Sequence, residues 1–227
     1  MSASATLEFR PAAVLFDMDG LLLDSERALL ACWREAARGL QASVDDGVWL
    51  SMIGLSDKVC DQLLQDRVGI SLAHALRERC HALYDLRVIA GIPVKPGAFE
   101  LLALLQQHRV PRAVVTSTWR ERARQKLAAA ELLGHFGDVI GGRDAPRPKP
   151  APDPYLLAAE RLGVPARDCV VLEDSNAGVQ AALAAGMHAI QVPDLAPADA
   201  VQLPGHRVVA SLHEARRLIE PALRSAQ

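Results

Sequence analysis

The chain has 227 residues, of which 50% are hydrophobic and 23% are charged, and its formal net charge is −2. These values fit one large domain or two smaller ones with enough apolar material for a core. They leave no basic surplus with which to bind nucleic acid or an anionic membrane.

Three further features bear on the location of the protein. No apolar run approaches the roughly 20 residues of a membrane span, and the first six residues lack the basic and apolar regions of a secretory signal. The four cysteines are widely spaced and form no Cys-x-x-Cys pair, which is typical of a reducing compartment. We therefore expect a cytoplasmic protein without a membrane anchor, and a monomer, because nothing in the sequence demands an oligomer.

The first predicted element is a short buried strand that ends in two acids. An apolar run over residues 13–16 is followed by Asp17 and Asp19, and Gly20 allows a sharp turn behind them. In an open α/β sheet, ligands bind at the carboxyl ends of the strands. Two carboxylates so close together repel each other unless a cation or a shared proton separates their roles.

A purely helical block follows this strand. Apolar spacings of three and four residues predict helices over 26–39 and 44–52, another beginning at Ser56, and one beginning at Ser71. A crossover between parallel strands normally needs a single helix. We therefore predict an inserted helical cap domain over residues 25–93, lying above the carboxyl edge of a core domain formed by 1–24 and 94–227. Its two connectors are candidate hinges for a lid.

The rest of the chain alternates between helices and strands. Its predicted helices span 96–108, 120–132, 152–162, 177–185 and 211–224, and its predicted strands span 112–115, 139–140, 169–172, 188–192 and 208–209. This alternation indicates an α/β fold, a Rossmann-like doubly wound parallel sheet with helices on both faces.

Hydroxyl side chains follow the second predicted strand. Thr116, Ser117 and Thr118 stand just before a predicted helix, where hydroxyls and backbone N–H groups suit an anion such as phosphate. Capping of that helix is an equally good interpretation for Ser117 and Thr118. For Thr116, which comes directly after the strand, we favour a functional role.

A lysine stands in the loop after the third predicted strand. Lys149 lies between two prolines, which stiffen the backbone around it. An ammonium held there would neutralise carboxylates and a phosphoryl oxygen. Such a residue in isolation is more often an ordinary surface lysine, but the acids that we expect beside it favour the functional interpretation.

Two more acids follow the fourth predicted strand. Glu173 and Asp174 are ordinarily explained by helix capping, with Asp174 or Ser175 as the N-cap. Together with the pair after the first strand, however, they place four carboxylates at one edge of the sheet, which requires a cation. Ligands that are all oxygen select a hard metal, and Mg²⁺ usually keeps waters and a substrate phosphate in its shell.

These residue types predict phosphoryl transfer. One aspartate attacks phosphorus to give an aspartyl-phosphate. Another protonates the leaving alcohol and then deprotonates the water that hydrolyses the intermediate. The metal, Thr116 and Lys149 hold the phosphoryl oxygens and stabilise their charge, while the helical lid excludes bulk water.

The order of these motifs resembles the haloacid dehalogenase superfamily, and within it the subfamily that contains β-phosphoglucomutase and small-molecule phosphatases. The resemblance covers nearly the whole chain. It implies that Asp17 is the nucleophile and Asp19 the acid and base. It implies Mg²⁺ bound by Asp17, the backbone carbonyl of Asp19 and Asp174, with Glu173 at the metal or in its second shell. The motifs that carry it are Asp17-Met18-Asp19-Gly20, Thr116, Lys149 with the run Lys-Pro-Ala-Pro-Asp-Pro-Tyr, and the run Leu-Glu-Asp-Ser-Asn-Ala-Gly at 172–178.

Two departures from the mutase pattern favour hydrolysis. Trp119 stands where the mutase has a lysine that helps to hold substrate, and Asp57 stands where its cap has an arginine that holds phosphate. A mutase must hold a bisphosphate at both ends, so the loss of two cations argues for a phosphatase. Lys58, Arg120 and Lys95 are the candidate replacements.

We therefore predict a Mg²⁺-dependent phosphatase acting on a small phosphorylated metabolite, such as a sugar or polyol phosphate. The alternatives are a phosphomutase and, less favoured, a non-enzymatic aspartyl-phosphate switch. Lys58 belongs to a cap loop, 54–58, for which substrate contact and a simple turn between helices are comparable interpretations. The predicted phosphate- or substrate-binding residues are Gly20, Ser117, Thr118 and Lys58.

Overall fold

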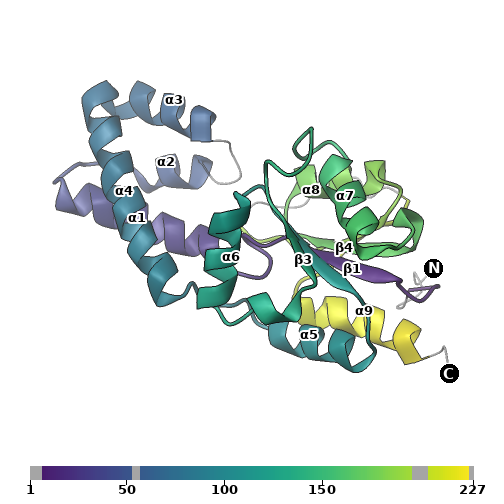
Figure 1. Cartoon of the computed structure of the whole chain (residues 1–227). Coiled ribbons are helices and arrows are strands. Elements are labelled where there is room, and N and C mark those ends of the chain that lie inside the picture. The colour runs from purple at the N-terminus through teal and green to yellow at the C-terminus, as the bar shows by residue number, and fades with distance from the viewer. Residues whose placement is uncertain (1–6, 53–56, 196–203, 225–227) are drawn as a thin grey trace.

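The core of the protein is a parallel β-sheet. The computed structural model describes residues 7–52, 57–195 and 204–224 (Figure 1). Within them, six strands form one sheet in the order β3-β2-β1-β4-β5-β6, with every neighbouring pair parallel. The strands are β1 (Ala13–Phe16), β2 (Arg112–Val115), β3 (Asp138–Ile140), β4 (Cys169–Glu173), β5 (His188–Gln191) and β6 (His206–Val208).

The register of the central strands determines which loops meet. Val14 of β1 lies opposite Arg112 of β2 and Val170 of β4, so these three strands end side by side. Strands β1 and β4 are buried along their whole length, as expected of near-continuous apolar runs in a parallel sheet. The predicted strands are confirmed, and β6 begins at His206, two residues before the predicted start. We call the edge formed by the carboxyl ends of β1, β2 and β4 the catalytic edge.

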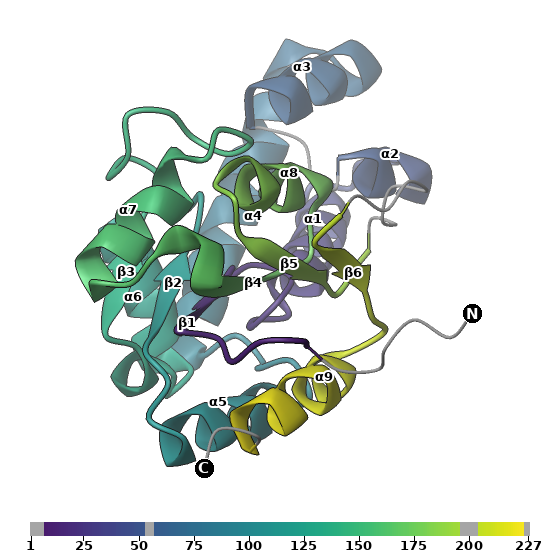
Figure 2. The ribbon, with the colours of Figure 1, turned by 90° about the vertical axis from the view of Figure 1, so that its right-hand side faces the viewer.

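Helices cover both faces of the sheet, which confirms the doubly wound class (Figure 2). One face packs against α5 (Ala98–Gln107), α6 (Arg120–Ala129) and α9 (Leu212–Arg224). The other packs against α7 (Asp153–Leu162) and α8 (Asn176–Ala184). The apolar residues of each strand alternate between these two cores, because successive side chains of a strand point to opposite faces.

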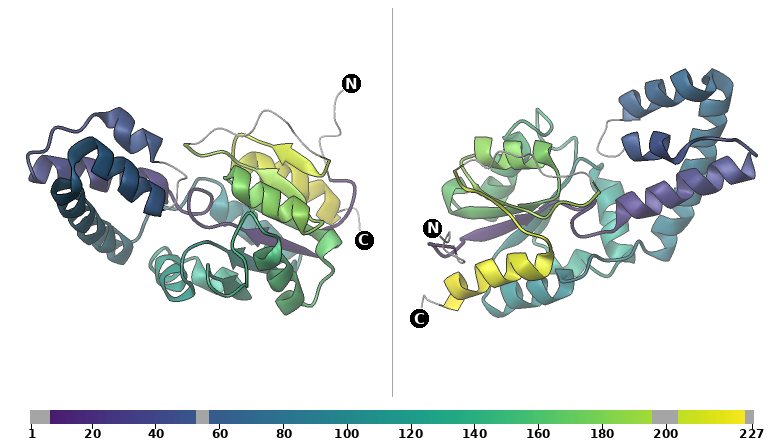
Figure 3. Two further views of the ribbon diagram at one scale, coloured as in Figure 1. Left: turned by 90° about the horizontal axis from the view of Figure 1, so that it is seen from above. Right: turned by 180° about the vertical axis from the view of Figure 1, so that it is seen from behind.

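The helices between β1 and α5 form a separate layer of structure. They are α1 (Ser25–Gly39), α2 (Asp46–Ser51), α3 (Asp57–Val68) and α4 (Ile70–Ala90). They enclose an apolar core of their own, in which the rings of Trp33 and Trp49 stack with centroids 5.4 Å apart. Helix α2 begins only at Asp46, because the Asp45 side chain accepts a hydrogen bond from the Gly47 amide and acts as its N-cap. Figure 3 shows this helical unit standing beside the α/β core, and we propose residues 25–93 as its limits.

The two connectors between the helical unit and the core run side by side. The Asp24 amide donates to the Pro93 carbonyl at 2.8 Å, and the Lys95 amide donates to the Leu22 carbonyl at 2.8 Å. The Asp194 carboxylate, which follows β5, accepts from Lys95 at 2.6 Å. Both connectors are thus held at one place, as a hinge requires. In the part of the chain that the structure covers, no helix has the length and apolar character needed to cross a membrane.

Candidate active site

Lys149 joins the ends of three strands, β1, β2 and β4, at the catalytic edge. Its ammonium donates to Asp17 Oδ1 at 2.7 Å, to Glu173 Oε1 at 2.6 Å and to the Val115 carbonyl at 2.9 Å. These three bonds match the three protons of a lysine ammonium. Burial lowers the pKa of Lys149, but the carboxylates of Asp17 and Glu173 outweigh it and hold that pKa well above its usual value. The lysine is therefore a fixed positive charge against the Asp17 carboxylate.

The carboxylate of Glu173 is completely buried, and both of its oxygens accept hydrogen bonds. Oε1 accepts from the Tyr155 hydroxyl at 2.9 Å in addition to Lys149. Oε2 accepts from the backbone amide and the hydroxyl of Ser175, each at 2.9 Å. Gly178 makes room for this cluster, since a Cβ there would lie 1.7 Å from Glu173 Oε1. Of the two places that the resemblance allows for Glu173, we infer the one behind the metal, where it holds Lys149 in position.

The carboxylates of Asp17 and Asp174 lie near each other and offer oxygen ligands to a cation. Among the described residues, the Asp174 side chain has no hydrogen-bond or ion-pair partner, and Gly20 (φ +84°) lets it approach so closely that a Cβ on Gly20 would lie 2.3 Å from Asp174 Oδ2. Burial, with the charges of Asp17 and Glu173, raises the pKa of Asp174 to about 9. Burial also raises the pKa of Asp17 to about 7, although Lys149 opposes it.

These oxygens fit Mg²⁺. Two neighbouring carboxylates that are hard to ionise are stabilised by a nearby cation, and Mg²⁺ is commonly held by one or two carboxylates with waters completing its shell. No cluster of three or more His, Cys, Asp or Glu side chains suited to a metal occurs in residues 7–52, 57–195 and 204–224. A magnesium site here would accordingly use Asp17, Asp174 and, as the resemblance implies, the backbone carbonyl of Asp19.

The Asp19 carboxylate pairs with a different lysine, Lys126. Its Oδ1 accepts from the Lys126 ammonium at 2.8 Å, and its Oδ2 accepts from the Thr118 hydroxyl at 2.8 Å. Burial raises the pKa of Asp19, but the charge and hydrogen bond of Lys126, with the bond from Thr118, lower it below the usual value overall. The two aspartates after β1 are thus placed in different environments, an arrangement that gives paired carboxylates distinct roles.

Sequence reasoning missed Lys126. It lies inside α6 among several other basic residues, and nothing in that pattern marks it. In the fold its side chain is only 6% exposed, and the ammonium lies 5.1 Å from the centroid of the Tyr84 ring on α4. Lys126 therefore connects Asp19 with the helical unit, and we assign it as the positioning residue of the predicted acid and base.

We expect Lys126→Met to lower kcat by at least about tenfold, because general acid–base catalysis depends on the placement and pKa of Asp19. Loss of the positive charge raises the pKa of Asp19. The limb of the pH–rate profile that requires ionised Asp19 therefore shifts to higher pH. Steady-state kinetics between pH 5 and 9 checks this. Lys126→Arg should restore part of the loss, and Arg124→Met on an exposed part of the same helix is the control. A folded Met variant with unchanged kcat and pH profile would contradict the assignment.

The structure places the remaining predicted residues as follows. Thr118 contacts Asp19, and the Thr116 hydroxyl, which is nearly buried, accepts from the Thr118 amide at 3.1 Å. Ser117 is exposed. Phosphate binding by these hydroxyls and by Gly20 stays a prediction. The Lys58 side chain and residues 54–56 of the cap loop lie outside the described residues.

Two of the candidate replacement cations are already paired. Arg120 donates to Asp138 at 2.8 Å and lies 3.7 Å from Asp144. Lys95 donates to Asp194. In this structure neither is free to hold a second phosphate.

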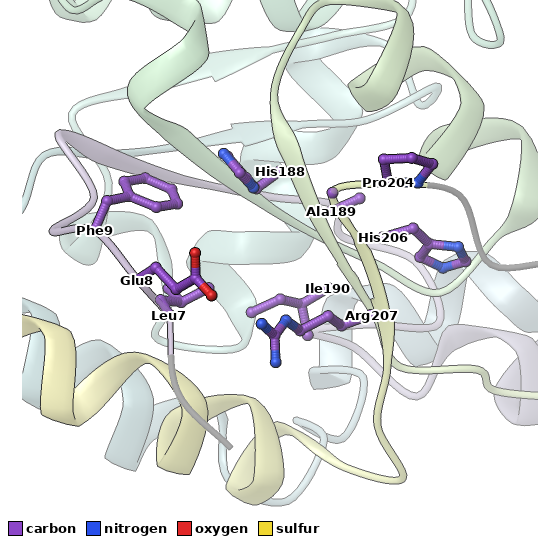
Figure 4. Close-up of a pocket in the computed structure, with 10 residues that line it drawn as sticks. Leu7, Glu8, Phe9, His188, Ala189, Ile190, Pro204, His206 and Arg207 are labelled. Atoms are coloured by element: carbon purple, nitrogen blue, oxygen red, sulfur yellow. The ribbon is translucent and has the colours of Figure 1, made fainter. Parts of the chain in front are cut away.

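A cavity of about 430 Å³ lies elsewhere on the molecule (Figure 4). It is lined by His188 and His206, which begin β5 and β6, and by Phe9, whose ring centroid lies 4.4 Å from that of His188. The cavity therefore opens at the amino ends of the strands, opposite the catalytic edge, and contains none of the predicted site residues.

The site combines an aspartate at a strand end, held by a lysine, with a helical insertion after β1. This chain belongs to the haloacid dehalogenase-like hydrolase family, whose model matches residues 11–186. It is 35% identical over 190 residues to a fructose-1-phosphate phosphatase of Escherichia coli. The match covers 81% of this chain and 97% of that protein. It is 34% identical over 202 residues to hexitol phosphatase A of the same organism, with 83% and 85% covered.

The fold is also similar to solved structures. A haloacid dehalogenase family hydrolase from Deinococcus radiodurans, solved with bound phosphate and sodium, superposes with a TM-score of 0.78 at 28% identity. The match covers 95% of this chain and 97% of that one. The likeness extends over both the α/β core and the helical unit.

Proposed function

We propose that this protein is a Mg²⁺-dependent, monomeric cytoplasmic phosphatase that hydrolyses a small sugar or polyol phosphate through an aspartyl-phosphate on Asp17. The chain is a phosphoric monoester hydrolase of the haloacid dehalogenase-like family. The observation that carries the proposal is the bridge from Lys149 to Asp17 and Glu173, which holds one oxygen of Asp17 and leaves the other available at the catalytic edge. The fructose-1-phosphate and hexitol phosphatase relatives support the substrate class.

The first step transfers the phosphoryl group to Asp17. The free carboxylate oxygen of Asp17 attacks phosphorus as the bond from phosphorus to the leaving oxygen breaks. Asp19, in its protonated form, gives its proton to that oxygen, so the sugar or polyol leaves as a neutral alcohol. Lys149 remains bonded to the other oxygen of Asp17 and fixes its direction of attack.

The second step returns the enzyme to its starting state. Asp19, now ionised, takes a proton from a water molecule, and the water oxygen attacks phosphorus. The bond between phosphorus and Asp17 breaks, which releases inorganic phosphate and restores the Asp17 carboxylate. The ion pair with Lys126 stabilises the ionised Asp19 that this step requires.

Asp17, Asp174 and the Asp19 carbonyl would hold Mg²⁺, which would supply positive charge that favours the ionised Asp17 and balances the phosphoryl oxygens. The pairing of Arg120 and Lys95 with their own carboxylates supports hydrolysis over a mutase, which must hold a second phosphate.

A panel of phosphorylated sugars and polyols, assayed for release of inorganic phosphate, tests the proposal. With MgCl₂ we expect at least one member to turn over at about 1 to 10³ s⁻¹, the usual range for enzymes. An excess of EDTA should remove the activity, and added Mg²⁺ should restore it. A mutase would instead interconvert sugar phosphates without net phosphate release. Absence of phosphate release from every member in the presence of Mg²⁺ would overturn the proposal.

A further inference from the structure

We propose that Trp119 and Arg143 form a recognition platform for the hydroxylated leaving group. The inference rests on the proposed phosphatase function and extends it, because it identifies the side chains that hold the part of the substrate that does not react. The two residues come from different loops, one after β2 at the catalytic edge and one after the neighbouring strand β3.

Trp119 is placed by the loop that also holds the predicted acid and base. It is the N-cap residue of α6 and comes directly after Thr118, whose hydroxyl bonds to Asp19. Adjacent Cα atoms are about 3.8 Å apart, so the backbone of Trp119 lies beside the residue that contacts the predicted acid and base. Its side chain is not packed into a core, since the residue is 56% exposed.

Arg143 is brought to Trp119 by a rigid contact between the two loops. The Gly142 amide donates to the Thr118 carbonyl at 3.0 Å, and a Cβ on Gly142 would lie 2.1 Å from the Ser117 carbonyl oxygen. The amide of the preceding residue, Gly141, donates to the Asp144 side chain at 3.0 Å. Only glycine permits this close approach, so the two side chains are held together before any ligand binds.

The pair presents an aromatic face and a set of hydrogen-bond donors. The central carbon of the Arg143 guanidinium lies over the Trp119 ring, 3.7 Å from its centroid. Arg143 has no carboxylate partner within the described ranges, whereas Arg120 at the start of α6 and Arg147 in the loop after β3 each pair with an aspartate. A guanidinium that stacks through its face keeps the N–H groups at its edge free.

This combination suits a sugar or polyol. A carbohydrate chain has C–H groups that pack on an exposed indole and hydroxyl oxygens that accept from arginine. Ligand sites commonly combine apolar and aromatic surface with a few convergent polar groups that fix orientation. Hydrophobic contact with the ring and hydrogen bonds from Arg143 would therefore favour a long hydroxylated chain over a short one.

The experiment compares a long substrate with a short one. We would measure kcat/KM for a hexitol phosphate and for glycerol 3-phosphate with the parent protein, Trp119→Ala, Arg143→Gln and the control Arg124→Gln. A subsite contact is worth about tenfold or more in kcat/KM. We expect each platform variant to lose about that factor on the hexitol phosphate, mostly through KM, and clearly less on glycerol 3-phosphate. Trp119→Phe and Arg143→Lys should recover part of the loss, and Arg124→Gln should match the parent.

The outcomes separate this inference from the proposed function. Equal losses on the long and short substrates, or no loss on either, in variants whose melting temperature matches the parent would overturn the platform. Failure of the parent protein to hydrolyse any sugar or polyol phosphate would instead overturn the proposed function.

Discussion

We expect replacement of Asp17 by asparagine to lower phosphatase activity by at least about 10⁴-fold, because removal of a nucleophile typically costs that much or more. An amide cannot attack phosphorus, and Lys149 then faces a neutral group in place of the carboxylate that it now contacts. Phosphate release from the best substrate of the panel measures the effect, and Asp66→Asn on the exposed part of α3 is the matched control. Turnover at the parent rate would exclude Asp17 as the nucleophile.

A comparison of Asp17→Asn with Asp19→Asn tests which aspartate is the nucleophile and which is the acid and base. p-Nitrophenyl phosphate has a leaving group that needs no proton, so its first step does not depend on an acid. With this substrate we expect Asp19→Asn to give a burst of about one equivalent of p-nitrophenol followed by slow turnover, because only the second step lacks its base. Asp17→Asn should give no burst. The reverse pattern would exchange the roles of the two residues.

The pH dependence of stability shows whether Asp17→Asn damages the fold. Burial raises the pKa of Asp17 in the metal-free protein from 3.8 to about 7, despite Lys149. A raised folded-state pKa means that stability present below the unfolded value is lost as the pH rises to the folded value. Asparagine does not ionise, so in EDTA at pH 8 the variant should melt at or above the temperature of the parent. A large decrease would indicate a structural role instead.

We expect replacement of Lys149 by methionine to lower both activity and stability. The change leaves Asp17 and Glu173 as buried carboxylates without their shared cation, and the loss of one member of a buried ion pair costs about 3–5 kcal/mol in the free energy of unfolding. We expect phosphate release to become undetectable and the urea midpoint to fall accordingly. Arg147→Met is the control, because Arg147 stands in the same loop but is largely exposed and pairs with Asp153.

A double variant separates the two effects of Lys149. When Glu173→Gln is added to Lys149→Met, one uncompensated negative charge disappears, so part of the stability should return. Activity should not return, because Asp17 still lacks the cation that orients it. Recovery of phosphate release along with stability would show that Lys149 serves the fold alone.

Much of the fold follows from periodicity within the sequence. The apolar run before Asp17 and its counterpart before Glu173 predict buried strands, and both are central strands of the sheet. The length of helical sequence between residue 25 and β2 predicts an insertion, because one crossover helix suffices to join parallel strands. The start of a helix was harder to predict where a side-chain cap sets it. Helix α2 begins at Asp46 and not at residue 44, because the Asp45 side chain accepts a hydrogen bond from the Gly47 amide.

The candidate site was predictable where it depends on strand ends. Asp17, Lys149 and Glu173 were all expected at one edge, and the structure brings the Lys149 ammonium within hydrogen-bond distance of both carboxylates. Lys126 was not predictable, because a lysine within a basic helix carries no local signal of its partner. The ion pair between Arg120 and Asp138 was not predictable either, because it depends on how α6 packs beside β3.

The sequence alone therefore determined the class of chemistry: acids after β1 and β4, a lysine between prolines, and a helical insertion above them. Those features are local, and parallel strands bring their carboxyl ends to the same edge whatever the details of packing. Only the tertiary structure decided how the charges are divided, with Lys149 on Asp17 and Lys126 on Asp19. It also decided that Glu173 supports Lys149, and that Arg143 reaches Trp119. Ion pairs and stacking depend on distances of a few ångströms between segments far apart in the chain, and that proximity is created only when the helices pack on the sheet.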